Sequence, residues 1–107
     1  VQAGNVESAV RAFRESTGTD PTYVPGWRLL GAALRPTDPD GAVEAWRRAV
    51  DLSPGDVDAL LDLTALLHET GSAGDARPYL ERYLEAQPPD AARVVEVRRR
   101  LAELSAP

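Results

Sequence analysis

Few side chains in this sequence could support catalysis. His68 is the only histidine, and the chain contains no cysteine. A histidine can act as a general base, but it needs a nucleophile or a substrate proton within hydrogen-bond reach. No cysteine exists, and helical spacing brings no serine next to His68. We therefore interpret His68 as a solvated or surface-groove side chain and expect no catalytic residue and no enzymatic activity.

Metal and nucleotide chemistry are also poorly supported. Asp56, Asp58 and Asp62 are closely spaced, but Asp56 is better placed as a helix cap. Two carboxylates without a histidine do not complete a transition-metal site. The segment Gly71-Ser72-Ala73-Gly74 matches no phosphate-binding fingerprint and suits a turn between helices. The sequence predicts neither a metal site nor a cofactor.

The charge balance disfavours nucleic acid as a partner. The formal net charge is −5, whereas phosphate binding depends on clustered positive charge. Arg98, Arg99 and Arg100 form the only basic run, and on a helix they would point about 100° apart. No stretch approaches the ~20 apolar residues that span a bilayer. All 12 basic residues are arginine, a bias typical of a GC-rich bacterial genome, and nothing fixes the compartment.

The elements that position these residues follow an internal repeat. Three sets of residues recur at spacings of 33 and then 34: the prolines 21, 54 and 88, the alanines 9, 42 and 76, and the large residues Phe13, Trp46 and Leu80. Trp27, Leu30, Gly31 and Leu34 recur 33 residues later as Leu60, Leu63, Thr64 and Leu67, and more loosely as Val94, Val97, Arg98 and Leu101. The turn around 35–38 is one residue shorter than the corresponding turn 33 to 34 residues later. A period of this length indicates a helical repeat array.

The repeat resembles the tetratricopeptide repeat. Residues 27–34 are similar to its W-x2-L-G-x2-Y signature, and Ala42, Trp46 and Pro54 are similar to the alanine, aromatic and proline of its second half. The resemblance implies an all-α, right-handed α-solenoid of antiparallel helix pairs, with about 2.5 repeats and a C-terminal capping helix. Leu34, Thr64 and Tyr83 depart from the family pattern, at the tyrosine, glycine and small-residue positions respectively.

Hydrophobic spacing predicts helices at 6–17, 23–35, 39–52, 57–70, 74–86 and 91–104. Asp38, Asp56 and Asp90 are the expected N-caps, with Asp75 as the cap that would place Pro78 in a first turn. Gly18 and Gly71 are the expected helix ends. We expect one domain over 1–107: 5–21 as the second helix of a partial repeat, whose partner would lie upstream of Val1, then repeats at 22–54 and 55–88, and a capping helix with tail at 89–107.

The resemblance also implies a concave surface, lined by the first helix of each pair, that binds extended peptides or partner helices. Helical spacing identifies the residues that would face it. The candidates are Arg28, Ala32, Arg35, Asp58, Leu61, Asp62, Ala65, His68 and Arg99, with Pro25 at the entrance and Val95 as a further contact, whereas Arg93, Glu96, Arg100 and Glu103 would face water.

This predicted surface is mixed in charge. Arg28 and Arg35 would face the side that carries Asp58 and Asp62, so the charges either pair with one another and with water or fix the register of a bound peptide, with Leu61 as an apolar contact. One subclass of the family clamps a C-terminal carboxylate with basic residues. Asp58 and Asp62 argue against that role here and favour a ligand with a basic residue.

The sequence thus predicts a non-catalytic scaffold that binds a protein or peptide partner. One alternative is self-association through an exposed seam on the first helix, near 5–17, because repeats bury their faces only against neighbours. Another is an accessory domain of a larger, possibly enzymatic, protein.

Overall fold

The computed structural model describes residues 3–86 and 91–105. Within these residues all regular secondary structure is helical, as the repeat pattern predicts. The chain divides into two compact units, Val1–Ser53 and Pro54–Pro107. The division falls next to the repeat boundary expected after residue 54.

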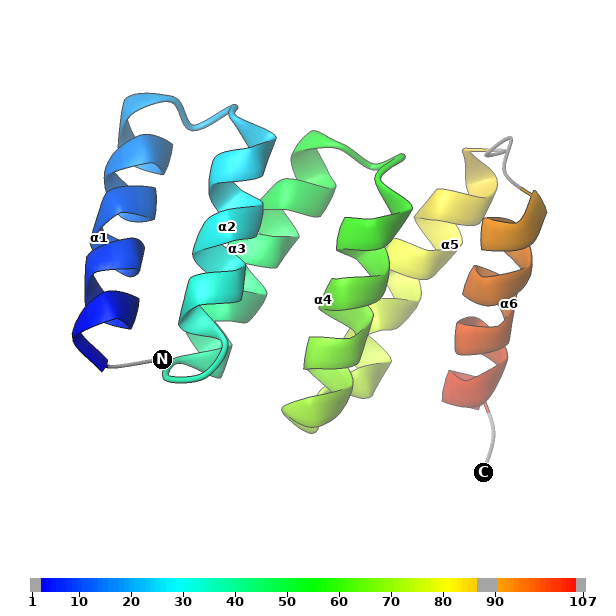
Figure 1. Ribbon diagram of the computed structural model, residues 1–107. Coiled ribbons are helices and arrows are strands. Elements are labelled where there is room, and N and C mark those ends of the chain that lie inside the picture. The colour runs from blue at the N-terminus through cyan, green and yellow to red at the C-terminus, as the bar shows by residue number, and fades with distance from the viewer. Residues whose placement is uncertain (1–2, 87–90, 106–107) are drawn as a thin grey trace. The chain divides into compact units, whose positions relative to one another are not determined.

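The first unit consists of α1 (Ala3–Thr19), α2 (Val24–Leu34) and α3 (Pro39–Leu52). Successive helices run in opposite directions, and α2 contacts both α1 and α3 (Figure 1). Leu30 and Leu34 of α2 are buried, as are Ala42, Trp46 and Ala49 of α3. The alanines occur where the helices must approach closely, and the leucines and the indole fill the remaining space.

The second unit consists of α4 (Val57–Glu69), the short 3-10 helix η1 (Ala73–Ala76), α5 (Arg77–Glu85) and α6 (Ala91–Ser105). Its helices also alternate in direction, and α5 contacts α4 and α6 (Figure 1). Buried apolar residues come from all the helices of the unit: Ala59, Leu60, Leu63, Leu66, Leu67, Ala76, Leu80, Tyr83 and Val97. Thr64, at the glycine position of the repeat, is buried too, and its hydroxyl donates to the Leu60 carbonyl at 2.9 Å.

Three predicted helix signals are confirmed. The Asp38 carboxylate accepts from the Gly41 N–H at 3.0 Å, and the Asp56 carboxylate accepts from the Ala59 N–H at 3.1 Å. Gly71 ends α4 with φ of +81°. Its N–H donates to the His68 carbonyl, and the Ser72 N–H donates to the Leu67 carbonyl at 2.8 Å. This pair of bonds is the Schellman C-cap. The expected cap Asp90 lies outside the described residues.

One predicted helix stop and one predicted N-cap are wrong. Gly18 does not stop the first helix, which continues to Thr19, because the following Asp20-Pro21 step ends it: a residue before proline is driven out of the helical region. Asp75 does not cap the fifth helix; it lies inside η1, and α5 begins at Arg77 with Pro78 in its first turn. The proline is tolerated there because a first-turn N–H has no helical acceptor.

Candidate functional site

The first candidate site is a shallow cavity of about 320 Å³ on the first unit, lined by Pro25, Arg28, Leu29, Ala32 and Trp46. We call it the α2 cup, because every lining residue except Trp46 belongs to α2. Pro25, Leu29 and Ala32 are spaced by four and three residues and therefore share one helix face. Leu29 is 49% exposed, whereas the next residue, Leu30, is buried.

Trp46 contributes to the cup from α3, and Gly31 permits its position. A Cβ atom built on Gly31 would lie 2.7 Å from the indole Nε1 of Trp46. Any residue larger than glycine would therefore push the indole away from α2. The glycine of the repeat signature thus determines how closely the aromatic ring approaches the face that carries Leu29 and Ala32.

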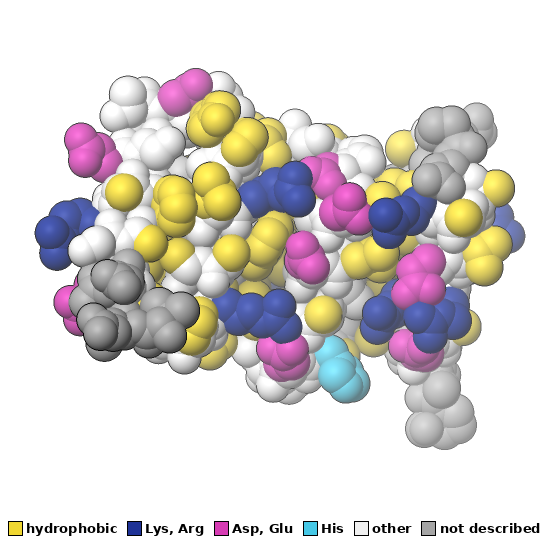
Figure 2. Space-filling model, viewed as in Figure 1, with side chains coloured by type: hydrophobic (Ala, Val, Ile, Leu, Met, Phe, Trp, Pro, Cys, Tyr) yellow, Lys and Arg dark blue, Asp and Glu magenta, His cyan; other side chains and the backbone are white. Residues whose placement is uncertain are grey.

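Hydrophobic side chains gather over the α1 and α2 part of the first unit (Figure 2). Tyr23 and Leu29 are the large hydrophobic residues of this part with high exposure, at 49% each. A separate cavity between α1 and α2, of about 410 Å³, is lined by Val6, Glu7, Val10, Arg11, Arg14, Leu34 and Thr37. Val6 and Val10 are half-buried there, and self-association through this face stays a prediction.

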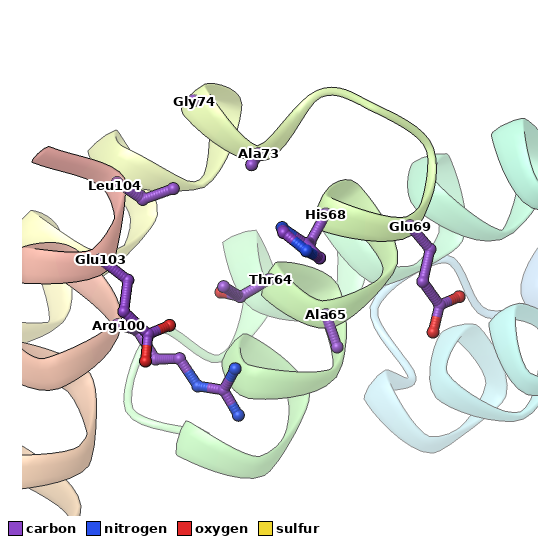
Figure 3. A pocket seen from close by; sticks show the side chains of 9 residues that line it. All are labelled: Thr64, Ala65, His68, Glu69, Ala73, Gly74, Arg100, Glu103 and Leu104. Carbon is purple, nitrogen blue, oxygen red and sulfur yellow. The ribbon is translucent and has the colours of Figure 1, made fainter. Parts of the chain in front are cut away.

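The second candidate site is a cavity of about 420 Å³ on the second unit, which we call the α4–α6 pocket. It is lined by Thr64, Ala65, His68 and Glu69 of α4, Ala73 and Gly74 of η1, and Arg100, Glu103 and Leu104 of α6 (Figure 3). The Arg100 side chain extends from α6 toward α4, and the His68 ring lies over the space between α4 and η1, whereas Glu69 turns away from α6 (Figure 3).

An ion pair joins the beginnings of α4 and α6. The Arg93 guanidinium lies 3.1 Å from the Asp58 carboxylate, and both side chains are partly exposed. Arg93 was expected to face water; its side chain is 42% exposed, and it also pairs with Asp58. Asp58 is therefore already engaged within the unit, although an exposed pair of this kind contributes only ~0–1 kcal/mol to stability.

A second set of charges lies along α6. Glu96 accepts from Arg99 at 2.7 Å and from Arg100 at 3.2 Å, and Glu103 accepts from Arg99 at 3.1 Å. The hydrogen bond from Arg99, together with the charges of Arg99 and Arg100, holds the pKa of Glu96 below its ordinary value. Arg99, a predicted groove residue, thus has two carboxylate partners on its own helix. The Arg98–Arg100 run is in part an internal ion-pair cluster.

The structure brings some of the predicted surface residues together. Arg28 and Ala32 share the α2 cup with Pro25, and Ala65 and His68 share the α4–α6 pocket. Arg35 lies outside the cup as the C-cap of α2, and Val95 is 66% exposed on α6. Leu61 and Asp62 are half-buried on α4. Arg28 and Arg35 belong to a different unit from Asp58 and Asp62, so their expected opposition stays a prediction.

Several lining residues were missed at the level of sequence. Trp46 was expected only to fill the gap between neighbouring helices, Arg100 and Glu103 were expected to face water, and no role was predicted for Leu29 and Leu104. A signal existed for Leu29, because it falls four residues after Pro25 and three before Ala32 and so shares their face. None existed for Arg100, because the third occurrence of the repeat is too loose to fix the rotation of α6.

The described residues offer neither a metal cluster nor a membrane-spanning helix. No group of three or more histidine, cysteine, aspartate or glutamate side chains in residues 3–86 and 91–105 is arranged to hold a metal ion. Over the same part of the chain, no helix combines the length and apolarity that crossing a membrane requires.

Antiparallel helices with a sequence period of 33 to 34 residues define a helical-repeat protein. The family model of the tetratricopeptide repeat matches residues 33–101, well over half of the chain, and the chain belongs to that family. The repeat signature had predicted this membership.

Two relatives place the chain within the family. It is 30% identical over 88 residues to a peroxisomal targeting signal receptor of Yarrowia lipolytica, a match that covers 81% of this chain and 15% of the receptor. It is 33% identical over 76 residues to a TPR repeat-containing protein of Pseudomonas aeruginosa, covering 68% of this chain and 72% of that protein. The second relative agrees with the bacterial composition bias. The chain thus spans only a small part of the receptor.

Proposed function

We propose that this chain is a non-catalytic interaction module that binds a segment of a partner protein, with candidate contacts on α2 in the first unit and on α4 and α6 in the second. Tetratricopeptide repeats generally mediate protein–protein interaction, and repeat stacks use their helix faces as extended binding surfaces. One observation carries the proposal: residues predicted to face a partner line two separate cavities, Arg28 and Ala32 in the α2 cup and Ala65 and His68 in the α4–α6 pocket.

The contacts within the second unit refine the roles of the proposed surface residues. Asp58 and Arg99 hold ion-pair partners of this chain, so we assign Asp58 to the contact between α4 and α6 and Arg99 to ion pairs within α6. Leu61, Ala65 and His68 are the proposed contacts on α4, with Asp62 beside them. One relative is by name the receptor of a targeting signal, which supports recognition of a segment of another protein by this repeat.

A displayed library of random dodecapeptides, selected against the immobilised chain, tests the proposal. We expect enriched peptides that bind in solution and shift the backbone amide resonances of α2 and α4. Leu61→Ala should weaken binding by about tenfold, or ~1.4 kcal/mol, as loss of an interface side chain commonly does. The matched control is Leu52→Ala, which removes an exposed leucine from α3 and should leave the affinity unchanged.

Two results would contradict the proposal. One is the absence of any peptide enriched above a blank surface. The other is a set of resonance shifts that includes α3 and α5 and spares α2, α4 and α6, since these three helices carry the proposed contacts.

Self-association through α1 is the alternative, favoured by the apolar residues Val6, Val10 and Leu34 in the α1–α2 cavity. Light scattering after size-exclusion chromatography separates the two proposals. An interaction module gives the monomer mass of 11.5 kDa over a wide concentration range, whereas a self-associating chain gives a mass that rises with concentration.

A further inference from the structure

The α1–α2 cavity, of about 410 Å³, combines apolar and basic side chains. Val6 and Val10 of α1 and Leu34 of α2 supply its apolar lining, and Arg11 and Arg14 line it as well. The lining residues of α1 recur at the three- and four-residue spacing of one helix face. Both valines are half-buried, whereas both arginines are exposed. The cavity thus presents apolar surface beside two guanidinium groups that solvent can reach.

These two arginines differ from most other basic residues of the chain. All 12 basic residues are arginine, and all except Arg11, Arg14 and Arg98 have an ion pair, a ring contact or another side-chain interaction within the chain. Over residues 3–86 and 91–105, the guanidinium groups of Arg11 and Arg14 make no such interaction. Both can therefore pair with a partner without breaking an existing contact.

The carboxylates near the cavity do not cancel this charge. Glu7 is the acidic residue among the described residues that line it, so one carboxylate faces two guanidinium groups. Asp38 follows the lining residue Thr37, but its carboxylate accepts from the Gly41 N–H at the beginning of α3. An acidic group placed in the cavity would therefore meet an excess of positive charge.

The repeat itself does not require this basic pair. Arg11 corresponds to Glu44 in α3 and to Pro78 in α5, at the repeat spacings of 33 and 34 residues. Glu44 forms an ion pair with Arg48 on its own helix. The combination of two exposed arginines without partners and a half-buried valine pair is thus particular to α1, and packing of the repeats does not explain it.

The occupant of this cavity must satisfy its own backbone groups. α1 and α2 use their interior N–H and C=O groups within the helices, so they offer no strand edge to an extended peptide. A helix has no such need and can lay an apolar stripe into a groove. The lining residues of α1 extend from Val6 to Arg14, about 12 Å along the axis, which matches about two turns of a docked helix.

We propose that the α1–α2 cavity binds an amphipathic acidic helix of a partner protein, whose apolar side chains contact the valines and Leu34 and whose carboxylates pair with Arg11 and Arg14. This interface goes beyond the proposed function, because α1 carries none of the contacts assigned there. The net charge of −5 repels an acidic partner at long range. Preferential binding of such a helix would therefore report the local contacts.

Fluorescence anisotropy with labelled model helices tests the chemistry of the occupant. The probe is a peptide of Leu-Glu-Glu-Leu repeats, and two matched probes carry lysine in place of glutamate or serine in place of leucine. We expect the leucine–glutamate probe to bind the full chain at least about tenfold more tightly than either matched probe. Its binding should shift the backbone amide resonances of residues 6–14 and 34–37. Equal affinity for the glutamate and lysine probes would overturn the inference.

Charge variants test the roles of the arginines. Arg14→Glu should weaken the leucine–glutamate probe about tenfold or more, whereas Glu7→Gln should strengthen its binding by removing the one lining carboxylate. Arg98→Glu is the matched control, because Arg98 is an exposed arginine of α6 that also has no side-chain interaction within the described residues. It changes the net charge equally and should have little effect. Equal losses from Arg14→Glu and Arg98→Glu would contradict a local contact.

A neutral variant tests whether the cavity itself is occupied. Thr37→Phe adds a ring to the lining without changing charge and should weaken the same probe about tenfold. Ala12→Phe places the same ring on an exposed position of α1 that does not line the cavity and should leave the affinity unchanged. Circular dichroism establishes that each variant keeps its helical content. Retained affinity in the Thr37→Phe variant would overturn the inference.

The remaining outcomes separate this inference from the others. A dimer detected by light scattering that Arg14→Glu dissociates would assign the cavity to a second copy of the chain and overturn the acidic-helix partner. Selection of dodecapeptides that bind α2 and α4, with no binding of the acidic helix, would overturn the inference and leave the proposed function standing. Binding of the acidic helix without any selected dodecapeptide would do the reverse.

Discussion

Gly31 and Trp46 show how one backbone position controls a surface. The indole of Trp46 lies against Gly31, where a Cβ atom would approach Nε1 to 2.7 Å. The same indole lines the α2 cup. The glycine that the repeat requires for close helix packing therefore also determines the depth of the cavity that we assign to the partner.

We expect Gly31→Ala to destabilise the chain by about 1–3 kcal/mol, because the added methyl group overpacks a buried contact with an indole ring. Urea denaturation followed by circular dichroism measures the change. Gly18→Ala is the matched control: Gly18 lies in α1, and a methyl group added there would meet nothing within 4 Å, so this change should stabilise the chain by about 0.5–1 kcal/mol through helix propensity. Equal effects at the two sites would contradict the overpacking argument.

The sequence predicted only some of the residues that line the two cavities. Helical spacing predicted that Arg28 and Ala32 share one face of α2, and both residues line the α2 cup; that this face contacts a partner stays a prediction. The partner of Asp58 could not be predicted, because Asp58 and Arg93 are 35 positions apart in the sequence and lie on different helices. Pairing of exposed charges depends on tertiary placement, which the repeat period leaves open.

At the scale of the elements, the hydrophobic period predicted helix positions well. The third helix was predicted at 39–52 and is observed as Pro39–Leu52, because Asp38 and Pro39 mark its beginning without ambiguity. The fifth is the exception. The 3-10 turn η1 precedes α5 and contains Gly74 and Asp75, with Pro78 just after it. The spacing of apolar residues does not predict such a turn. The repeat boundaries themselves stay predictions.

The charge cluster of α6 predicts an acid-sensitive helix. Hydrogen bonding by Arg99 lowers the pKa of Glu96 in the folded chain, so the unfolded chain binds more protons as the pH falls through the carboxyl range. This contribution to stability is fully present above the ordinary glutamate pKa of about 4.3 and is lost as the pH falls through the lowered value.

At pH 7 the Glu96→Gln variant should consequently be less stable than the parent chain. On acidification from pH 5 to about pH 3, the variant should lose less stability than the parent chain does. Urea midpoints measured across this range check the prediction. The effect should be small and should shrink in 1 M salt, where the screening length falls to about 3 Å. A stability difference that stayed constant from pH 7 to pH 3 would show that Glu96 acts through packing.

For the whole molecule, net charge sets which macromolecules can approach. The chain carries −5 at neutral pH, and arginines 93, 99 and 100 form ion pairs with carboxylates on the second unit. The basic run that could have suggested nucleic-acid binding is in part neutralised by α6 itself.

We therefore expect no binding of labelled duplex DNA at physiological salt, up to protein concentrations of about 100 µM, the range of non-specific binding by basic proteins. Fluorescence anisotropy measures this, and the variant Glu96→Gln, which frees part of the arginine cluster, should also fail to bind. Binding that weakened steeply with added salt would reveal a phosphate-contacting surface and contradict the expectation.

Both tryptophans, Trp27 and Trp46, belong to the first unit. The Trp27 ring is fixed by a hydrogen bond to the Pro21 carbonyl at 2.8 Å. Intrinsic tryptophan emission is therefore a spectroscopic label confined to Val1–Ser53, while circular dichroism averages over the helices of both units. If helical repeats unravel in succession and not as one cooperative block, the two signals will give different transition midpoints, and the molecule will report the order of its own unfolding without an added dye.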